Sequence, residues 1–228
     1  MARRVKREIP STQEVATAVG AYNAVYCEMD EALWRVSTSV RGALVRHEPV
    51  PALEVLVWTI RNWWGVRGVK TKTRRIAAEA LAAMDWTDSM FGEEPVPDSR
   101  QFALHRVIAL VQRMNDLGVS RREFSLAAKV LHWLMPWRVA IYDSFVCKSV
   151  GISTASPQHA YAELVDWEFD AAERLSDGSS DWLGTVNPRS PIRALDKYLW
   201  WIGGGDRRMS VRVRDPWRIC RDLGLTRG

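Results

Sequence analysis

Two residues whose types suit covalent chemistry, Lys129 and Asp143, lie 14 positions apart in the sequence. Lys129 lies in a stretch, 124–135, that is hydrophobic nearly all round when wound as a helix, which predicts a buried helix. Burial disfavours the charged ammonium, and a neutral lysine is a nucleophile. Asp143 precedes a second expected helix, where a carboxylate can cap the helix or stabilise a developing positive charge. Each also has a structural interpretation: a lysine whose stem alone is buried, and an ordinary N-cap.

Other common catalytic arrangements are missing from the sequence. Cys27, Cys147 and Cys220 are widely spaced and form no C-x-x-C motif, which argues against a zinc site and a four-cysteine iron–sulfur cluster. The same cysteine usage favours a reducing, cytoplasmic location. Ser144 has no histidine and acid in the pattern of a serine hydrolase. We therefore expect neither a metal nor a cofactor.

The segment around Lys129 and Asp143 resembles a known catalytic segment. AAKVLHWL (127–134), then Pro136, then IYDS (141–144) is similar to the corresponding part of the helix-hairpin-helix DNA glycosylases, and closest to their 8-oxoguanine-glycosylase-like branch. RALDKYLWW (193–201) resembles a C-terminal helix of bacterial members. The resemblance implies a two-lobed all-α fold with the active site between the lobes. It also implies that Lys129 is the nucleophile and Asp143 the assisting carboxylate.

The sequence departs from this family's pattern at two places. Leu126-Ala127-Ala128 stands where the family has a Gly-x-Gly before the lysine, so we expect a degenerate hairpin. Phe145 replaces a polar residue of typical 8-oxoguanine enzymes. The expected substrate is double-stranded DNA that contains a modified base, either an oxidised purine such as 8-oxoguanine or a phage hypermodified cytosine such as glucosylated hydroxymethylcytosine. Excision leaves an abasic site, and elimination at that site would also cut the strand. The phage base would make this an antiviral defence enzyme.

Further residues are candidates for binding the flipped base and the DNA backbone. A flipped base needs a pocket with stacking groups, for which the candidates are His132, Trp133, Tyr142, Phe145, Trp200 and Trp201. Cationic side chains that could contact phosphates are Arg67, Lys70, Lys72, Arg121, Arg122 and Lys148. A solvated basic face explains the same charges equally well. A non-catalytic all-α DNA-binding or regulatory protein is therefore the alternative function.

The rest of the chain predicts helices and no alternating strand pattern. At 228 residues, with a formal charge of +5, it is long enough for one large unit or two lobes. We expect a single all-α catalytic unit, 1–228, with one lobe at 40–150 and a second formed by 1–39 with 151–228. Capping boxes at Ser11–Glu14 and Ser120–Glu123 predict two helix starts, the first helix ending near Ser37. No stretch is apolar enough to span a membrane, and we expect a monomer.

Overall fold

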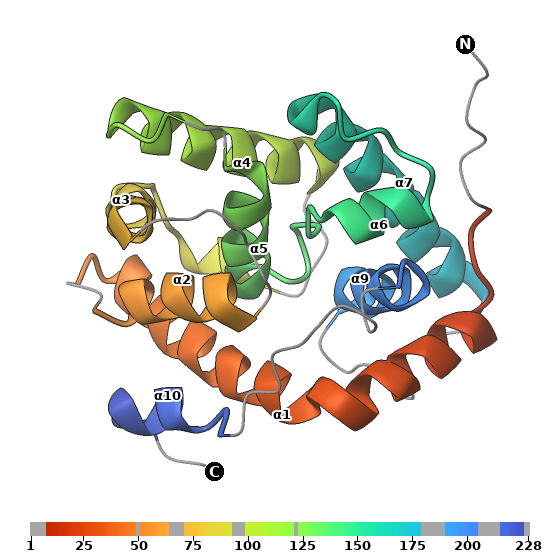
Figure 1. Ribbon diagram of the computed structural model, residues 1–228, viewed down its shortest axis with the longest axis horizontal. Helices are drawn as coiled ribbons and strands as arrows, with labels where there is room; N and C mark the ends of the chain where they lie inside the picture. The colour runs from red at the N-terminus through yellow and green to blue at the C-terminus, as the bar shows by residue number, and fades with distance from the viewer. Residues whose placement is uncertain are drawn as a thin grey trace. The chain divides into compact units, whose positions relative to one another are not determined.

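The computed structural model describes residues 8–48, 51–63, 71–92, 99–120, 123–178, 190–204 and 215–225. These residues form helices, turns and loops, with no β-strand among them (Figure 1). The helices are α1 (Thr12–Val45), α2 (Pro51–Trp63), α3 (Thr71–Ala82), η1 (Asp88–Phe91), α4 (Ser99–Asp116), α5 (Phe124–Leu134), α6 (Ser144–Ser149), α7 (Pro157–Gly178), α9 (Pro191–Ile202) and α10 (Arg218–Asp222). The all-α class predicted from the sequence is confirmed.

The first helix begins as predicted and runs further than predicted. The backbone N–H of Ser11 donates to Glu14 Oε2 at 2.8 Å, and the N–H of Glu14 donates to Ser11 Oγ at 3.3 Å. This reciprocal pair is the expected capping box. α1 then continues to Val45 because its buried stripe does not stop at Ser37: Val40 and Leu44 lie on the same face, one turn apart.

The start of α5 corrects the second predicted capping box. α5 begins at Phe124, and its N-cap is Glu123, which makes no side-chain capping hydrogen bond. Since Glu123 occupies the cap position itself, it cannot reach back to Ser120 in the way that a capping box requires. Lys129 is therefore the sixth residue of α5, closer to its start than expected.

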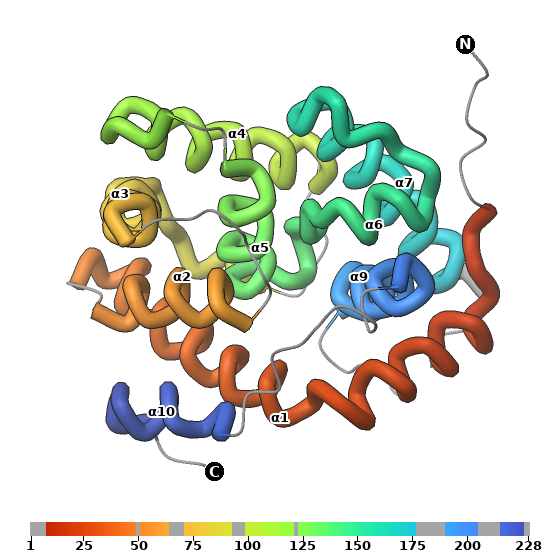
Figure 2. Tube along the Cα trace, viewed as in Figure 1, coloured from red at the N-terminus to blue at the C-terminus, as the bar shows by residue number. Residues whose placement is uncertain are grey.

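The chain divides into two compact units, each built from separate stretches of sequence. The first contains the described residues among 1–25, 93–105 and 136–209, and the second those among 26–92, 106–135 and 210–228. In the first unit, α6 and α7 pack against α9; in the second, α2 packs against α3 and α5. Within the stretch 40–150, expected as one lobe, this division passes from one unit to the other after Gly92, after His105 and after Met135, where α5 has ended. Figure 2 follows the chain from α5 through this point into α6.

Candidate active site

Lys129 lies on a buried helix of the second unit. Every residue of α5 except Ser125 is buried, and the Lys129 side chain is only 2% exposed. The predicted burial of Lys129 is therefore confirmed. Its neighbours His132 and Trp133 are buried as well, with their rings edge to face at 6.1 Å between centroids. Lys129 is thus held on a well-packed helix, as a nucleophile that must be desolvated would be.

The end of α5 is held by Arg41 of α1. The Arg41 Nη2 donates to the carbonyl oxygen of Trp133 at 3.1 Å, and its guanidinium lies 4.2 Å from the ring centroid of Trp34. The guanidinium also lies 6.0 Å from the ring of Phe91 in η1. A carbonyl of the last helical turn has no partner within the helix, so this contact satisfies it. Arg41 thereby links α1, η1 and α5 and fixes the helix that carries Lys129.

Asp143 lies in the first unit and begins α6. Its backbone is extended, with φ −143° and ψ 147°, and its Oδ1 accepts a hydrogen bond of 2.8 Å from the N–H of Phe145. The predicted N-cap is confirmed. Asp143 is half-buried. Capping fixes the orientation of the carboxylate, which a catalytic acid or base also needs.

Helix α9 holds both ends of the segment that leads to Asp143. At the start of α9, Ser190 Oγ donates to the carbonyl oxygen of Pro136 at 2.8 Å and accepts the N–H of Arg193 at 2.9 Å. At its end, a Cβ on Gly203 would lie only 2.6 Å from the backbone oxygen of Phe145. The missing side chain at Gly203 therefore allows α9 to approach the start of α6. Asp143 is held by this close packing rather than by its own helix, which has only six residues.

The predicted base-pocket residues of the first unit are a mixture of buried and half-buried aromatics. Tyr142 is buried and packs edge to face on Tyr161, at 6.2 Å between ring centroids. Burial, with smaller contributions from Cys147 and Asp143, raises the pKa of Tyr142 to about 12, so its hydroxyl stays protonated at neutral pH. Trp200 is buried and packs edge to face on Tyr22, at 5.7 Å between ring centroids. Phe145 and Trp201 are half-buried.

A buried polar cluster in the same unit was not predicted from the sequence. Arg193 Nη1 forms an ion pair with Asp196, and Arg193 Nη2 donates to Tyr22 Oη at 3.0 Å. Glu168 of α7 is fully buried, and neither of its carboxyl oxygens has a hydrogen-bond partner among the described residues. Burial raises the pKa of Glu168 well above its usual range; Asp196 adds to this and Arg193 opposes it. The signal in the sequence was an acid on the apolar stripe of Tyr161, Leu164 and Val165.

Cys147 does not compete as a nucleophile. It is buried in α6, and burial together with the Asp143 and Glu168 carboxyl groups raises its pKa to about 12. Since the thiolate is the reactive form, a thiol with this pKa is inert at neutral pH.

Of the six cations predicted to contact DNA, the structure describes two. Lys72 is exposed in the first turn of α3, and Lys148 is exposed on α6. Arg67, Lys70, Arg121 and Arg122 lie outside the described residues. Lys72 and Lys148 belong to different units, so they are two separate candidate contacts rather than one described surface.

The described residues contain no group of three or more histidine, cysteine, aspartate or glutamate side chains placed to hold a metal ion. The three cysteines are free thiols. Within the same part of the chain, no helix has both the length and the apolar character needed to span a membrane.

Comparison of this chain with protein-family models, with curated proteins and with solved structures finds no match. The chemistry of the site has to be argued from its own residues.

Proposed function

We propose that this chain is a DNA glycosylase of the helix-hairpin-helix type, with Lys129 as nucleophile and Asp143 as the assisting carboxylate. The observation that carries the proposal is the side chain of Lys129, 2% exposed on a helix buried almost throughout. A lysine held in an apolar, desolvated site is one of the forms in which an amine serves as a nucleophile. The oriented carboxyl group of Asp143, 14 residues on, adds the second group that the chemistry needs.

The reaction starts once the target nucleotide is flipped out of the duplex, because C1′ cannot be reached inside the base stack. The Nζ lone pair of Lys129 attacks C1′, and the glycosidic bond breaks with its electron pair leaving on the base. The Asp143 carboxylate stabilises the positive charge that develops on the sugar and accepts a proton from the attached amine. The sugar ring then opens to an imine. Hydrolysis of the imine leaves an abasic site and regenerates Lys129.

The substrate we propose is a modified base in double-stranded DNA. Phe145 and Trp201 are half-buried aromatics, which suit an apolar or stacking contact rather than a hydrogen-bonding one. The candidates are the two named from the sequence, an oxidised purine and a glucosylated hydroxymethylcytosine. The same imine could undergo elimination, which would cut the strand after the base is released.

The test is base release from duplexes that carry each candidate base, detected as abasic sites. Lys129→Gln removes the nucleophile, and Asp143→Asn removes the charge while keeping a side chain that caps helices as well as aspartate does. Both variants should lose base release and still bind duplex DNA. Arg113→Gln and Asp116→Asn, exposed on α4, are matched controls for loss of one charge of each sign and should keep activity.

Two results would contradict the proposal. Base release by Lys129→Gln at the wild-type rate would remove the nucleophile from the mechanism. Salt-sensitive duplex binding without release of any tested base, by an otherwise folded wild-type protein, would favour the alternative of a non-catalytic DNA-binding or regulatory protein.

A further inference from the structure

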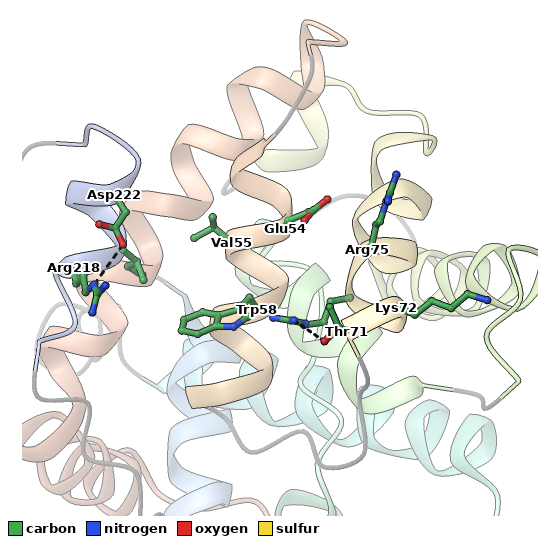
Figure 3. A pocket seen from close by; sticks show the side chains of 10 residues that line it. Glu54, Val55, Trp58, Thr71, Lys72, Arg75, Arg218 and Asp222 are labelled. Carbon is green, nitrogen blue, oxygen red and sulfur yellow. Dashed lines mark hydrogen bonds and ion pairs between the residues drawn. The ribbon is translucent and has the colours of Figure 1, made fainter.

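A pocket in the second unit lies outside the proposed catalytic residues. It has a volume of about 810 Å³ and is lined by α2, α3 and α10 (Figure 3). Ligand pockets typically span about 300–1,000 Å³, so a nucleotide fits within this volume. All of its lining residues belong to the second unit.

Trp58 presents an open aromatic surface to this pocket. Its side chain is 43% exposed, although its neighbours Val57 and Thr59 on α2 are fully buried. The residue lies on the outer face of α2, which also carries Glu54 and Val55, and the indole is not needed to complete the buried face. Figure 3 shows the indole extending from α2 toward the side of the pocket formed by Arg218 and Asp222. A tryptophan in this position is a platform on which a planar ring can stack.

The charges around Trp58 favour an anion. Four cationic side chains line the pocket, Lys72, Arg74, Arg75 and Arg218, against the two carboxylates Glu54 and Asp222. Two of the cations have carboxylate partners: Arg75 pairs with Glu79 at 3.0 Å, and Arg218 with Asp222 at 3.6 Å.

The other two cations have no carboxylate partner among the described residues. Arg74 donates to the hydroxyl of Thr71 at 3.0 Å, and Lys72 projects from α3 on the side away from Trp58 (Figure 3). Lys72 and Arg74 are therefore the charges available to a phosphate.

The α10 side of the pocket is fixed to α1. The Cys220 thiol donates to the carbonyl oxygen of Ala32 at 3.4 Å, and Arg35 of α1 lies 5.5 Å from the ring centroid of Trp217, which precedes α10. Ile219 and Cys220 are buried, which leaves Arg218 and Asp222 on the exposed side. The pocket is thus preformed within this unit, and a ligand would not have to order α10.

We propose that this pocket binds single-stranded nucleic acid, with one base stacked on Trp58 and the flanking phosphates on Lys72 and Arg74. A pocket lined by an exposed aromatic ring and by cations is the arrangement that binds single strands with little preference for sequence. The inference does not depend on base excision, since it uses none of the residues proposed for that reaction. It gives the protein a second nucleic-acid site, suited to a strand that is not paired.

The test measures binding of a fluorescein-labelled oligo(dT) of eight nucleotides by anisotropy, with the full chain. Trp58→Ala should weaken binding about 5- to 150-fold, the range that loss of one stacking contact produces. Trp58→Phe should recover most of this loss. Lys72→Gln with Arg74→Gln should make the slope of log K against log salt less negative by about 0.7 for each phosphate contact removed. Leu117→Ala, which removes another exposed apolar side chain of the second unit, is the control and should bind as the wild type.

Three additional arms locate the site and identify the ligand. An oligonucleotide that carries 5-iodouracil should photo-cross-link to the peptide that contains Trp58. Thymidine monophosphate should compete much more weakly than the oligonucleotide, and polyglutamate should not displace it at equal charge. Because Trp58 is exposed, the Trp58 variants should keep the thermal midpoint of the wild type, which separates loss of binding from loss of folding.

Binding by Trp58→Ala within twofold of the wild type, or cross-links found only elsewhere, would overturn the proposal. Displacement by polyglutamate would instead identify a site for acidic peptides, and an equal effect of the mononucleotide would identify a site for free nucleotides. Failure of base excision would leave this result untouched, because the assay measures binding alone.

Discussion

Replacing Glu168 by glutamine should stabilise the fold increasingly as the pH rises. Glu168 is fully buried on α7, and its carboxyl oxygens have no hydrogen-bond partner among the described residues. Burial, and secondarily the charge of Asp196, raises the pKa of Glu168 well above 4.5. Glutamine has nearly the same shape and cannot ionise, so the substitution removes this titration and leaves the packing of α7 on α9 in place.

The direction of this pH dependence follows from the number of protons that the folded and unfolded chains bind. Below pH 4.5 both the folded and the unfolded protein carry the proton, and the ionisation of Glu168 costs nothing. Above 4.5 the unfolded chain loses the proton while the folded protein keeps it, so the free energy of unfolding falls with pH until the folded pKa is passed. The slope in this window is at most about 1.4 kcal/mol per pH unit. For a chain of this length, that corresponds to about 3 to 6 °C in Tm per pH unit.

The assay is thermal unfolding followed by circular dichroism, in steps from pH 4.5 to pH 8. The Tm of Glu168→Gln minus that of the wild type should rise with pH and be smallest near pH 4.5. Glu173→Gln removes an exposed acid from the same helix and should show no such trend. A difference between Glu168→Gln and the wild type that is constant over this range would mean that Glu168 is solvated or charged in the folded protein, and would refute the reasoning.

Substitutions at two positions, Asp143 and Gly203, test how Asp143 is held, all of them by urea denaturation. Asp143→Ala removes the cap on α6 and should cost about 1 kcal/mol, while Asp143→Asn should stay close to the wild type; equal stability of all three proteins would exclude a capping role. Gly203→Ala should destabilise by about 1–3 kcal/mol because its Cβ would lie 2.6 Å from the backbone oxygen of Phe145. Gly203 has φ −70°, where alanine is otherwise preferred, so a stabilised Gly203→Ala would show that α9 does not approach Phe145 this closely.

Local patterns predicted the parts of the fold that depend on neighbouring residues. The capping hydrogen bonds of Ser11, Asp143 and Ser190 involve residues two or three positions away, so the sequence around each cap is enough to expect them. The burial of Lys129 could be predicted for the same reason, because helical spacing alone shows an apolar residue on nearly every side of it.

Contacts between distant stretches were not predictable in this way. The capping box predicted at Ser120–Glu123 was wrong, because α5 starts at Phe124 and Glu123 takes the cap position that the pattern gives to Ser120. The role of Gly203 depends on Phe145, 58 positions earlier, and the Arg193–Tyr22 hydrogen bond joins residues 171 positions apart. Likewise, no pattern near Trp58 indicates that Arg218 lines the same pocket.

The central claim is that Lys129 becomes covalently attached to the sugar of its substrate. Sodium borohydride, added while the wild-type protein acts on duplexes that carry the candidate bases, should reduce the imine and leave protein joined to DNA. Peptide mapping should place the attachment at Lys129, and Lys129→Gln should give no adduct. An adduct that maps to another residue, or base release that continues in Lys129→Gln, would contradict the account.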